Sequence, residues 1–424
     1  MASLTSTDLA ICAISTASIA GVIARPFRLP EATWTTVGAL LVLLLGLMPL
    51  SLAWAALVSG IDVYLFLVGM LLLAEYARRE GLFDWLAGFA AQHARGSQHR
   101  LFALTYAVGI VVTVFLSNDA TAVVLTPAVF ATARAVRATP LPYVLVCAFI
   151  ANAASFVLPI SNPANLVVFG PSMPVLTSWL ARFGWPSMVA IAMTYGSLWL
   201  TQRHALRGSI GLAIEQSSIS LGGRIALGGI VLMAVALLLA SAGGRELGLP
   251  TCVAGTLCAA AIVAVKRESP WPALRTISWS VLPLVASLFV LVFAVRSTGI
   301  LDAVLPLLQR PSAASASSTS FVAGTLVAIV CNGMNNLPLG LFLGSIANGT
   351  RLPDVVVNAL LIGVDLGPNL SVTGSLATIL WLVVLRREGV EVSGWQFLRL
   401  GFVVMFPALL MALIVNVLVA WMAS

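Results

Sequence analysis

The chain has 424 residues, of which 60% are hydrophobic and only 9% carry a charge. A soluble domain cannot bury that much apolar surface, and a transmembrane β-barrel would show short alternating segments instead of the long apolar runs present here. The sequence therefore predicts an all-α polytopic membrane protein. Its formal net charge of +7 follows from membrane topology, as argued below, and indicates no nucleic-acid partner.

Long apolar runs recur from one end of the chain to the other. They predict ten spanning helices and two re-entrant hairpins, at 8–24, 32–50, 60–77, 101–133 (hairpin), 142–170, 186–201, 224–242, 249–265, 278–296, 319–349 (hairpin), 354–385 and 397–421. The first run has no basic segment before it and no small-residue cleavage site after it. We therefore expect it to stay in the protein as a membrane helix.

Polar residues interrupt the segment 101–133 at its centre, within 116–127. Each arm is too short, at ~24 Å as a helix, to cross the ~30 Å hydrocarbon core. Basic residues stand at both ends, which indicates a re-entrant hairpin with its polar tip near the midplane. Asp119 lies at that tip and is a candidate functional residue, because a carboxylate costs ~3 kcal/mol in lipid. The alternative is that Ser117 or Asp119 only caps the helix that follows.

The second half shows the same features. Segment 319–349 is interrupted at 331–338, and in both halves a Pro- and Asn-rich interruption follows the hairpin. These interruptions predict broken helices over 142–170 and 354–385. Open backbone at mid-depth must line a cavity, because lipid cannot satisfy its hydrogen bonds. A kink that serves only packing is the alternative for each break.

The basic residues predict the orientation. If the loop 78–100 is cytoplasmic, seventeen of the 22 basic residues lie on that side. They are Arg25, Arg28, Arg78, Arg79, Arg95, Arg100, Arg134, Arg137, Arg203, Arg207, Arg224, Lys266, Arg267, Arg275, Arg386, Arg387 and Arg399. The other five are Arg182, Arg245, Arg296, Arg310 and Arg351. This positive-inside signal places both termini outside.

A polar linker at 203–223 divides the spans into two sets of five. The first repeat, 1–202, then starts outside, and the second, 224–424, starts inside. Two inverted-topology repeats of five transmembrane helices, each with a re-entrant hairpin and a broken helix, place a binding site near the midplane.

Three motifs resemble a known family. S-N-D-A-T-A at 117–122, the tip at 335–338 and G-V-D-L-G-P-N-L-S-V-T-G-S-L-A-T-I-L-W at 363–381 look like those of the arsenite efflux permeases. These arsenical pump membrane proteins belong to the ion transporter superfamily, which also includes dicarboxylate, citrate and sodium–proton carriers. The resemblance covers most of the chain except the linker. The wider superfamily commonly has Ser-Asn-Thr at the first tip, and Asp119 departs from it as the arsenite members do.

The resemblance implies a secondary carrier that exports trivalent arsenite or antimonite from the cytoplasm in exchange for protons. It implies the bacterial inner membrane as location and, in some members, a soluble ATPase as partner. A proton- or sodium-coupled carrier of a dicarboxylate or citrate, or a sodium/proton exchanger, is the alternative. No Arg or Lys stands near any interruption, which argues against a carboxylate substrate, although helix N-termini can also hold anions.

The expected substrate site combines polar residues of all four interruptions, because arsenious acid is uncharged at neutral pH and its hydroxyls suit amides and hydroxyls. The candidates are Ser117, Asn118, Thr121, Asn162, Asn165, Cys331, Asn335, Asn336, Asn369, Thr373 and Ser375. Cys331 is included because trivalent arsenic binds thiols. The alternative for Cys331 is a small buried hydrophobic residue.

Proton coupling needs a group that changes charge, and Asp119 and Asp365 are the acids closest to the interruptions. Burial favours the protonated form of a carboxylate, so either residue can exchange a proton. We expect Asp119 to carry the exchangeable proton and Asp365 to support it. Asp62 is expected at a helix N-terminus and Glu75 in a surface ion pair.

Other classes of protein fit less well. The chain has no G-x-x-x-x-G-K-[ST] loop for nucleotide hydrolysis, and its three histidines fall in loops without metal-ligand spacing. We therefore expect neither enzyme activity nor a cofactor or metal. A channel is the remaining class, since re-entrant hairpins also build selectivity filters. The paired breaks favour a carrier with alternating access.

Overall fold

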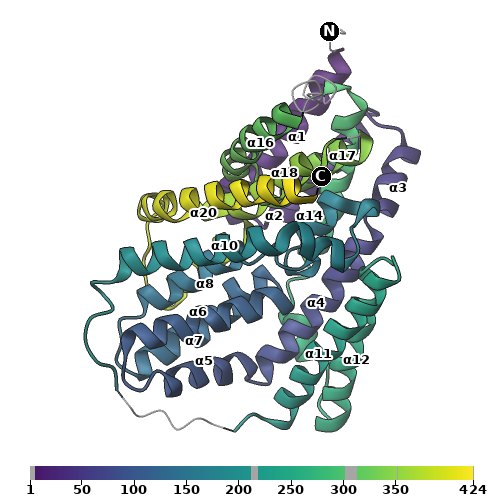
Figure 1. The fold of residues 1–424 in the computed structure, drawn as a ribbon. Helices are drawn as coiled ribbons and strands as arrows, with labels where there is room; N and C mark the ends of the chain where they lie inside the picture. Colours follow the sequence, from purple (N-terminus) through teal and green to yellow (C-terminus); the bar gives the residue numbers. More distant parts are fainter. Residues whose placement is uncertain (1–4, 212–217, 301–312, 351, 424) are drawn as a thin grey trace.

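The computed structural model describes residues 5–211, 218–300, 313–350 and 352–423. Within these ranges every regular element is helical, and the one strand-like pairing is an isolated bridge between Ser97 and Ser209. Figure 1 shows a stack of roughly parallel helices with others that run steeply along one side of it. The predicted all-α fold is confirmed.

The first half of the chain contains one long helix after another, joined by short turns. Its elements are α1 (Ser6–Ala24), η1 (Pro26–Arg28), α2 (Glu31–Leu44), α3 (Leu50–Ser59), α4 (Ile61–Arg79), α5 (Leu82–His93), α6 (Gln98–Phe115), η2 (Ala120–Leu125), α7 (Thr126–Ala135), α8 (Leu141–Ala153), η3 (Pro159–Ser161), α9 (Pro163–Phe169), η4 (Gly170–Ser172) and α10 (Leu176–Gln202).

The second half repeats the order of hairpin, broken helix and long final helix. Its described elements are α11 (Leu221–Ala242), α12 (Gly248–Lys266), α13 (Trp271–Thr276), α14 (Val281–Ser297), α16 (Ala313–Met334), α17 (Asn336–Gly349), α18 (Asp354–Leu366), η6 (Gly367–Asn369), η7 (Val372–Gly374), α19 (Leu376–Arg387) and α20 (Gly394–Ala423). Part of the predicted linker 203–223 lies outside the described residues.

Two expected segments differ in detail. The span expected at 32–50 ends earlier, at Leu44, because Gly46 adopts a left-handed φ of 66° and Pro49 starts the separate helix α3. The loop expected at 78–100 contains the helix α5. Its apolar residues recur at helical spacing and pack on α6 and α7, a pattern that the flanking arginines concealed.

Membrane-crossing length is not uniform. Among the described residues, five helices are long and apolar enough to cross a membrane, namely α6, α11, α12, α16 and α20, and α3 with α4 makes a sixth if that pair, bent by 45°, counts as one span. The shorter apolar helices include both segments of the first hairpin's second arm and the first segment of a broken helix. This mixture is expected where helices are re-entrant or interrupted.

The two hairpins have tips where the sequence predicts them. In the first, α6 ends at Phe115 and the returning arm begins with the π-helical segment η2. This widened turn forms because Pro127 has no N–H to donate, while the Thr126 hydroxyl donates to the Ala122 carbonyl at 2.7 Å. In the second, Asn335 separates α16 from α17 with a positive φ of 71°.

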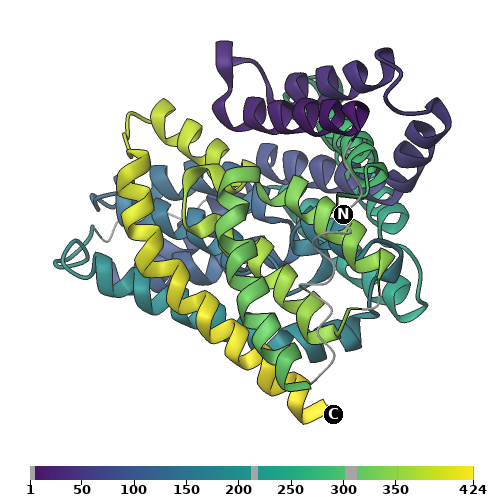
Figure 2. The same cartoon turned by 90° about the horizontal axis from the view of Figure 1, so that it is seen from above.

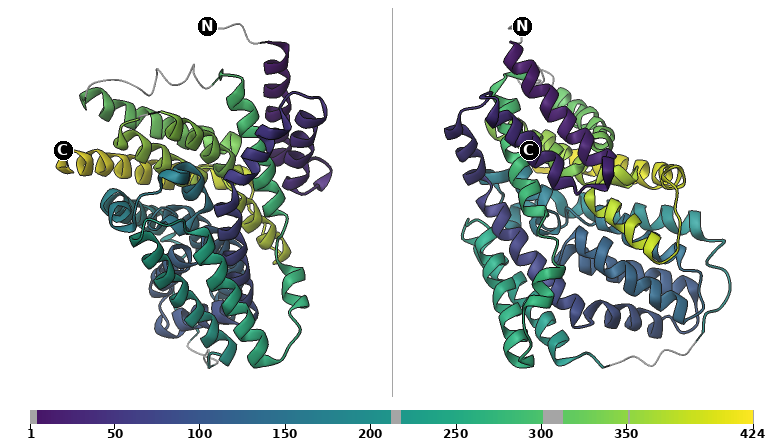
Figure 3. Two further views of the ribbon diagram at one scale, coloured as in Figure 1. Left: turned by 90° about the vertical axis from the view of Figure 1, so that its right-hand side faces the viewer. Right: turned by 180° about the vertical axis from the view of Figure 1, so that it is seen from behind.

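The helices form two groups, each of which contains elements of both halves. In the first group α4 packs on α12 and α2 on α14; in the second, α10 packs on α20 and α9 on α17. Figure 2 shows α20 beside α16 and α18, with α1 and α2 across the molecule. Figure 3 shows α11 and α12 on one side and α10 and α20 on the other.

Close backbone contact explains the tightest pairing in the first group. A Cβ atom added to Gly69 on α4 would lie 2.2 Å from the Thr251 carbonyl oxygen on α12, and one added to Gly255 would lie 2.2 Å from the Gly69 carbonyl oxygen. Only glycine allows the two backbones to approach this closely, as is common between helices in membranes.

Loops predicted on the same side of the membrane lie together. At one end, the linker donates from Ile210 N to Gly96 O and from Gly211 N to Val136 O, both at 2.9 Å, and Lys266 pairs with Glu80 at 2.9 Å.

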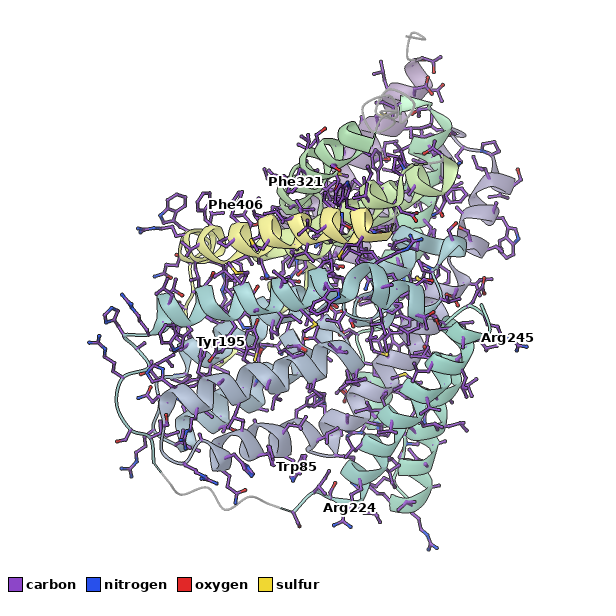
Figure 4. The ribbon with its side chains drawn as sticks, in the orientation of Figure 1. Trp85, Tyr195, Arg224, Arg245, Phe321 and Phe406 are labelled. Atoms are coloured by element: carbon purple, nitrogen blue, oxygen red, sulfur yellow. The ribbon has the colours of Figure 1, made fainter. Side chains whose placement is uncertain are left out.

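At the other end, Arg182 pairs with Asp354 at 2.7 Å, and Gly248 N donates to Asp62 Oδ1 at 2.6 Å. Figure 4 shows Arg224 and Arg245, predicted on opposite sides, at opposite ends of the α11–α12 pair. Which end faces the cytoplasm stays a prediction.

Candidate functional site

The two broken helices cross at the centre of the second group, in antiparallel directions. Near the start of α8, the Val144 carbonyl accepts a hydrogen bond from Trp381 Nε1 at 2.8 Å. Near its end, Asn152 Nδ2 donates to Asn369 Oδ1 at 3.0 Å. Residue numbers in the second broken helix therefore fall as those in α8 rise, which means that the two helices run antiparallel. The breaks predicted within 142–170 and 354–385 meet.

Asp365 and Asn162 make the shortest contact between the breaks. Asn162 Nδ2 donates to Asp365 Oδ1 at 2.5 Å, and both residues are buried. Asn162 also caps α9, since its Oδ1 accepts from Ala164 N at 3.0 Å. Among the described residues, the second oxygen of Asp365 has no hydrogen-bond partner. The Asn162 side chain thus caps a helix of the first half and donates a hydrogen bond to an aspartate of the second half.

The same arrangement occurs a second time with the halves exchanged. Asn152 is the next-to-last residue of α8, as Asp365 is of α18. Asn152 Nδ2 donates to Thr378 Oγ1 at 3.4 Å, in the first turn of α19, whose N-cap Ser375 accepts from Thr378 N at 3.1 Å. A carboxylate therefore occupies one of two equivalent positions and an amide the other.

The second hairpin tip is fastened to the second break by Asn332. Its Nδ2 donates to the Gly367 carbonyl at 3.1 Å and its Oδ1 accepts from Ser371 Oγ at 2.7 Å. Thr373 Oγ1 donates to the Asn332 carbonyl at 2.7 Å. Cys331 is fully buried and its Sγ lies 3.5 Å from the Gly374 carbonyl oxygen, so the thiol is enclosed in this conformation.

The first tip is held mainly by local hydrogen bonds. Ser117 Oγ accepts from Ala120 N at 3.2 Å, and Asn118 Oδ1 accepts from Asp119 N at 2.9 Å. Thr121 lies 2.8 Å from the hydroxyl of Thr113 on the opposite arm.

The break of the same half reaches this tip through Ser161, whose Oγ donates to the Val114 carbonyl at 3.1 Å. Segment η2 also packs against α19, the helix that follows the other break. The first tip therefore contacts elements of both breaks.

Asp119 differs from its neighbours at the tip. It is half-buried, and its carboxylate makes no capping hydrogen bond to η2. Ser117 and Asn118 therefore satisfy the backbone of the tip, which leaves the Asp119 carboxylate available for another partner.

The remaining expected site residues differ in their hydrogen-bond partners. Asn165 Nδ2 donates to the carbonyls of Ser155 and Leu158, at 2.8 and 3.2 Å, and so satisfies open backbone at the first break. Asn335 caps α17 through Leu337 N at 3.4 Å. Asn336 is buried at the start of α17.

Other polar residues of this network were not among the expected site residues, in particular Asn152, Asn332, Ser371 and Thr378. Asn332 had a signal, since it lies within the interrupted run 331–338. Asn152 is a single polar residue in an apolar helix, and Thr378 follows the second break. Neither position therefore has a signal in the sequence. Within the described residues, the hydrogen bonds that join the breaks and the tips involve no Lys or Arg side chain.

The two acidic residues that we did not expect to couple transport, Glu75 and Asp62, have partners outside the crossing. Glu75 accepts from Arg78 at 2.7 Å and from Thr276 Oγ1 at 2.5 Å. Asp62 satisfies the start of α12 through Gly248 N. Both positions are structural.

Known proteins agree with this architecture. The chain is similar to an arsenical pump membrane protein of Yersinia enterocolitica, with 28% identity over 82% of this chain and 83% of the relative. It is 27% identical to an arsenical pump membrane protein of Escherichia coli, over 95% of this chain and 96% of the relative. The resemblance inferred from the motifs is thus confirmed.

A solved structure supports the fold alone. The YdaH transporter of Alcanivorax borkumensis, described as having an unusual topology, matches with a TM-score of 0.56 and 14% identity over 88% of both chains. A model of the family described as citrate transporters matches residues 19–364, most of the chain. The chain therefore belongs to this family and is a multi-pass membrane transporter.

Proposed function

We propose that the protein is a secondary active transporter that exports trivalent arsenite or antimonite from the bacterial cytoplasm, across the inner membrane, by proton antiport with alternating access. We also propose that 1–202 and 224–424 are its two inverted repeats, joined by a cytoplasmic linker. The names of the relatives support an arsenical substrate. The observation that carries the proposal is the polar network of amides and hydroxyls where the two breaks cross.

The chemistry of that network suits an uncharged, hydroxylated solute. Arsenious acid can donate and accept hydrogen bonds with amide and hydroxyl groups without bringing a charge into a buried site. A tricarboxylate would need compensating cations or free backbone N–H groups.

The helix N-termini that could bind an anion carry side-chain caps. Asn162, Asn335 and Ser375 each accept a backbone N–H of the helix that they begin. Their caps reduce the donors available to a carboxylate substrate. Citrate or a dicarboxylate, which the family description suggests, is therefore the second candidate.

Asp119 is the better candidate for the exchangeable proton. Asp119 is a half-buried residue at a hairpin tip, and its side chain does not cap η2, whereas Asp365 is enclosed and bonded to Asn162. A group that couples transport must meet solvent or substrate in turn on each side. Asp365 instead holds the two breaks together.

The test uses everted membrane vesicles with an imposed pH gradient. Wild-type vesicles should take up arsenite, and uptake should saturate and stop when the gradient collapses. Asp119→Asn keeps the size of the side chain but cannot titrate, so proton-driven uptake should be abolished. The control is Asp84→Asn, an exposed aspartate on α5, which should leave uptake unchanged.

Several outcomes would redirect the proposal. Wild-type uptake of citrate or succinate without arsenite would favour the second candidate, and a sodium requirement would replace the proton. Current that rises linearly with voltage and needs no counter-ion would indicate a channel. Proton-driven uptake by Asp119→Asn at the wild-type rate would remove Asp119 from coupling. Uptake that needs ATP and an added arsenical pump ATPase would show the second mode that the resemblance implies.

A further inference from the structure

A cavity opens at the end of the molecule opposite the linker. It lies between α9, η4 and α10 of the first half and α17 and α18 of the second. Its polar lining comes from Ser172, Ser178, Arg182, Asn348 and Asp354. Its volume is about 290 Å³. That size is at the lower end of the range of small-molecule sites.

An ion pair joins the two halves across this cavity. Arg182 of α10 lies 2.7 Å from Asp354 at the start of α18, and their side chains are 30% and 70% exposed. The Asn348 amide donates to the Val168 carbonyl at 3.3 Å and so fixes the end of α17 to the end of α9. The cavity therefore has charged groups of both signs whose charges cancel.

Helix α9 connects this cavity with the crossing of the breaks. Its N-cap Asn162 belongs to the polar network, and its last residues, Val168 and Phe169, line the cavity. Seven residues of helix separate the two places by about 10 Å. Gly344 of α17 packs so closely on α9 that a Cβ added to it would lie 2.2 Å from the Val167 carbonyl oxygen. Helices α9 and α17 are therefore tightly packed against each other beside the cavity.

We propose that this cavity is an outer binding subsite for the small, neutral, hydroxylated solute that leaves the polar network. The assignment rests on the proposed function. The Arg182–Asp354 pair keeps the subsite free of net charge, so that it receives the uncharged solute through hydroxyl and amide groups and does not retain anions.

The first experiment converts the cavity into an anion site. In everted vesicles the lumen corresponds to the predicted outer face, so the lumen is loaded with sulfate or, at equal ionic strength, with chloride. Asp354→Asn leaves Arg182 without its partner. Arsenite uptake by this variant should be slower with sulfate than with chloride by roughly two- to fivefold, the scale of a partly exposed charge contact.

Wild type and the double variant Arg182→Gln/Asp354→Asn should be equally fast with either anion. An Asp354→Asn variant that is insensitive to sulfate, in vesicles where wild type exports arsenite normally, overturns the subsite alone. Wild-type vesicles that carry citrate and no arsenite overturn the proposed function and the assignment to a neutral solute together.

The second experiment fills the cavity. Ser178 lines it, while the adjacent Thr177, which is also exposed, does not. Ser178→Trp should slow arsenite export severalfold, and Thr177→Trp, which adds a similar bulk on the same turn of α10, should not. Equal rates for the two variants, at equal amounts of folded protein, would overturn the subsite.

Discussion

Replacing Asn162 by alanine tests the crossing of the two broken helices most directly. The change removes the 2.5 Å hydrogen bond to Asp365 and the cap on Ala164 N. An unpaired buried acceptor costs ~1–3 kcal/mol, and a lost N-cap costs ~1 kcal/mol. We therefore expect Asn162→Ala to lower the free energy of unfolding by ~2–4 kcal/mol.

A double-mutant cycle isolates the contact from the cap. Asp365→Ala removes the acceptor, so once it is absent the loss of the Asn162 amide should matter less. The two changes together should cost ~1–3 kcal/mol less than the sum of the single changes. The free energies would come from denaturant titration in detergent micelles, followed by tryptophan fluorescence.

Asn416 supplies a matched control. Its buried amide bonds Ser320 Oγ and the Val355 carbonyl, and Val355 is about 15 Å along α18 from Asp365. Asn416→Ala should destabilise the protein but add to Asp365→Ala within about 0.5 kcal/mol. If the Asn162 pair were equally additive, the contact between the halves would not exist and the crossing would be wrong.

Two further predictions concern packing. Gly344→Leu should abolish the folded, monodisperse protein in size-exclusion chromatography, because its Cβ would collide with the Val167 carbonyl. Gly333→Leu is the control and should run as wild type, because a Cβ added there has no atom within 4 Å. Equal elution profiles for the two variants would refute the close contact. Trp381→Phe removes the hydrogen bond from the indole N–H to the Val144 carbonyl and shrinks a fully buried side chain. It should lower stability by ~1–3 kcal/mol, seen as a lower melting temperature in detergent. An unchanged melting temperature would mean that this bond does not form.

The sequence predicts where the interruptions lie because polar residues are conspicuous in apolar segments. The tip at 117–121 and the break that begins at Gly367 occur where expected, and the first break contains Pro159 but begins earlier, since α8 already ends at Ala153. The chemistry of each break is visible as well, since Pro and Asn both disfavour continued helix.

The sequence does not predict which interruptions meet. Asn162 and Asp365 are 203 residues apart, and their contact depends on the angle at which two helices cross. Asn152 could not be predicted, because a single amide within α8 has no local signal in the sequence. Its role depends on the residues of the second break that lie beside it. Cys331 shows the converse, since its place at a tip predicts contact with substrate, but the fold encloses the thiol between backbone carbonyls.

The crossing of the broken helices has a consequence for biosynthesis. The amides of Asn152 and Asn162 emerge from the ribosome 217 and 203 residues before their partners. At about 5–20 residues per second, these groups wait roughly 10–40 s for partners to be synthesised. An unpaired amide is unstable in lipid. The nascent first half is therefore less stable in the bilayer by itself, and we expect the insertion machinery to shelter it until the second half arrives.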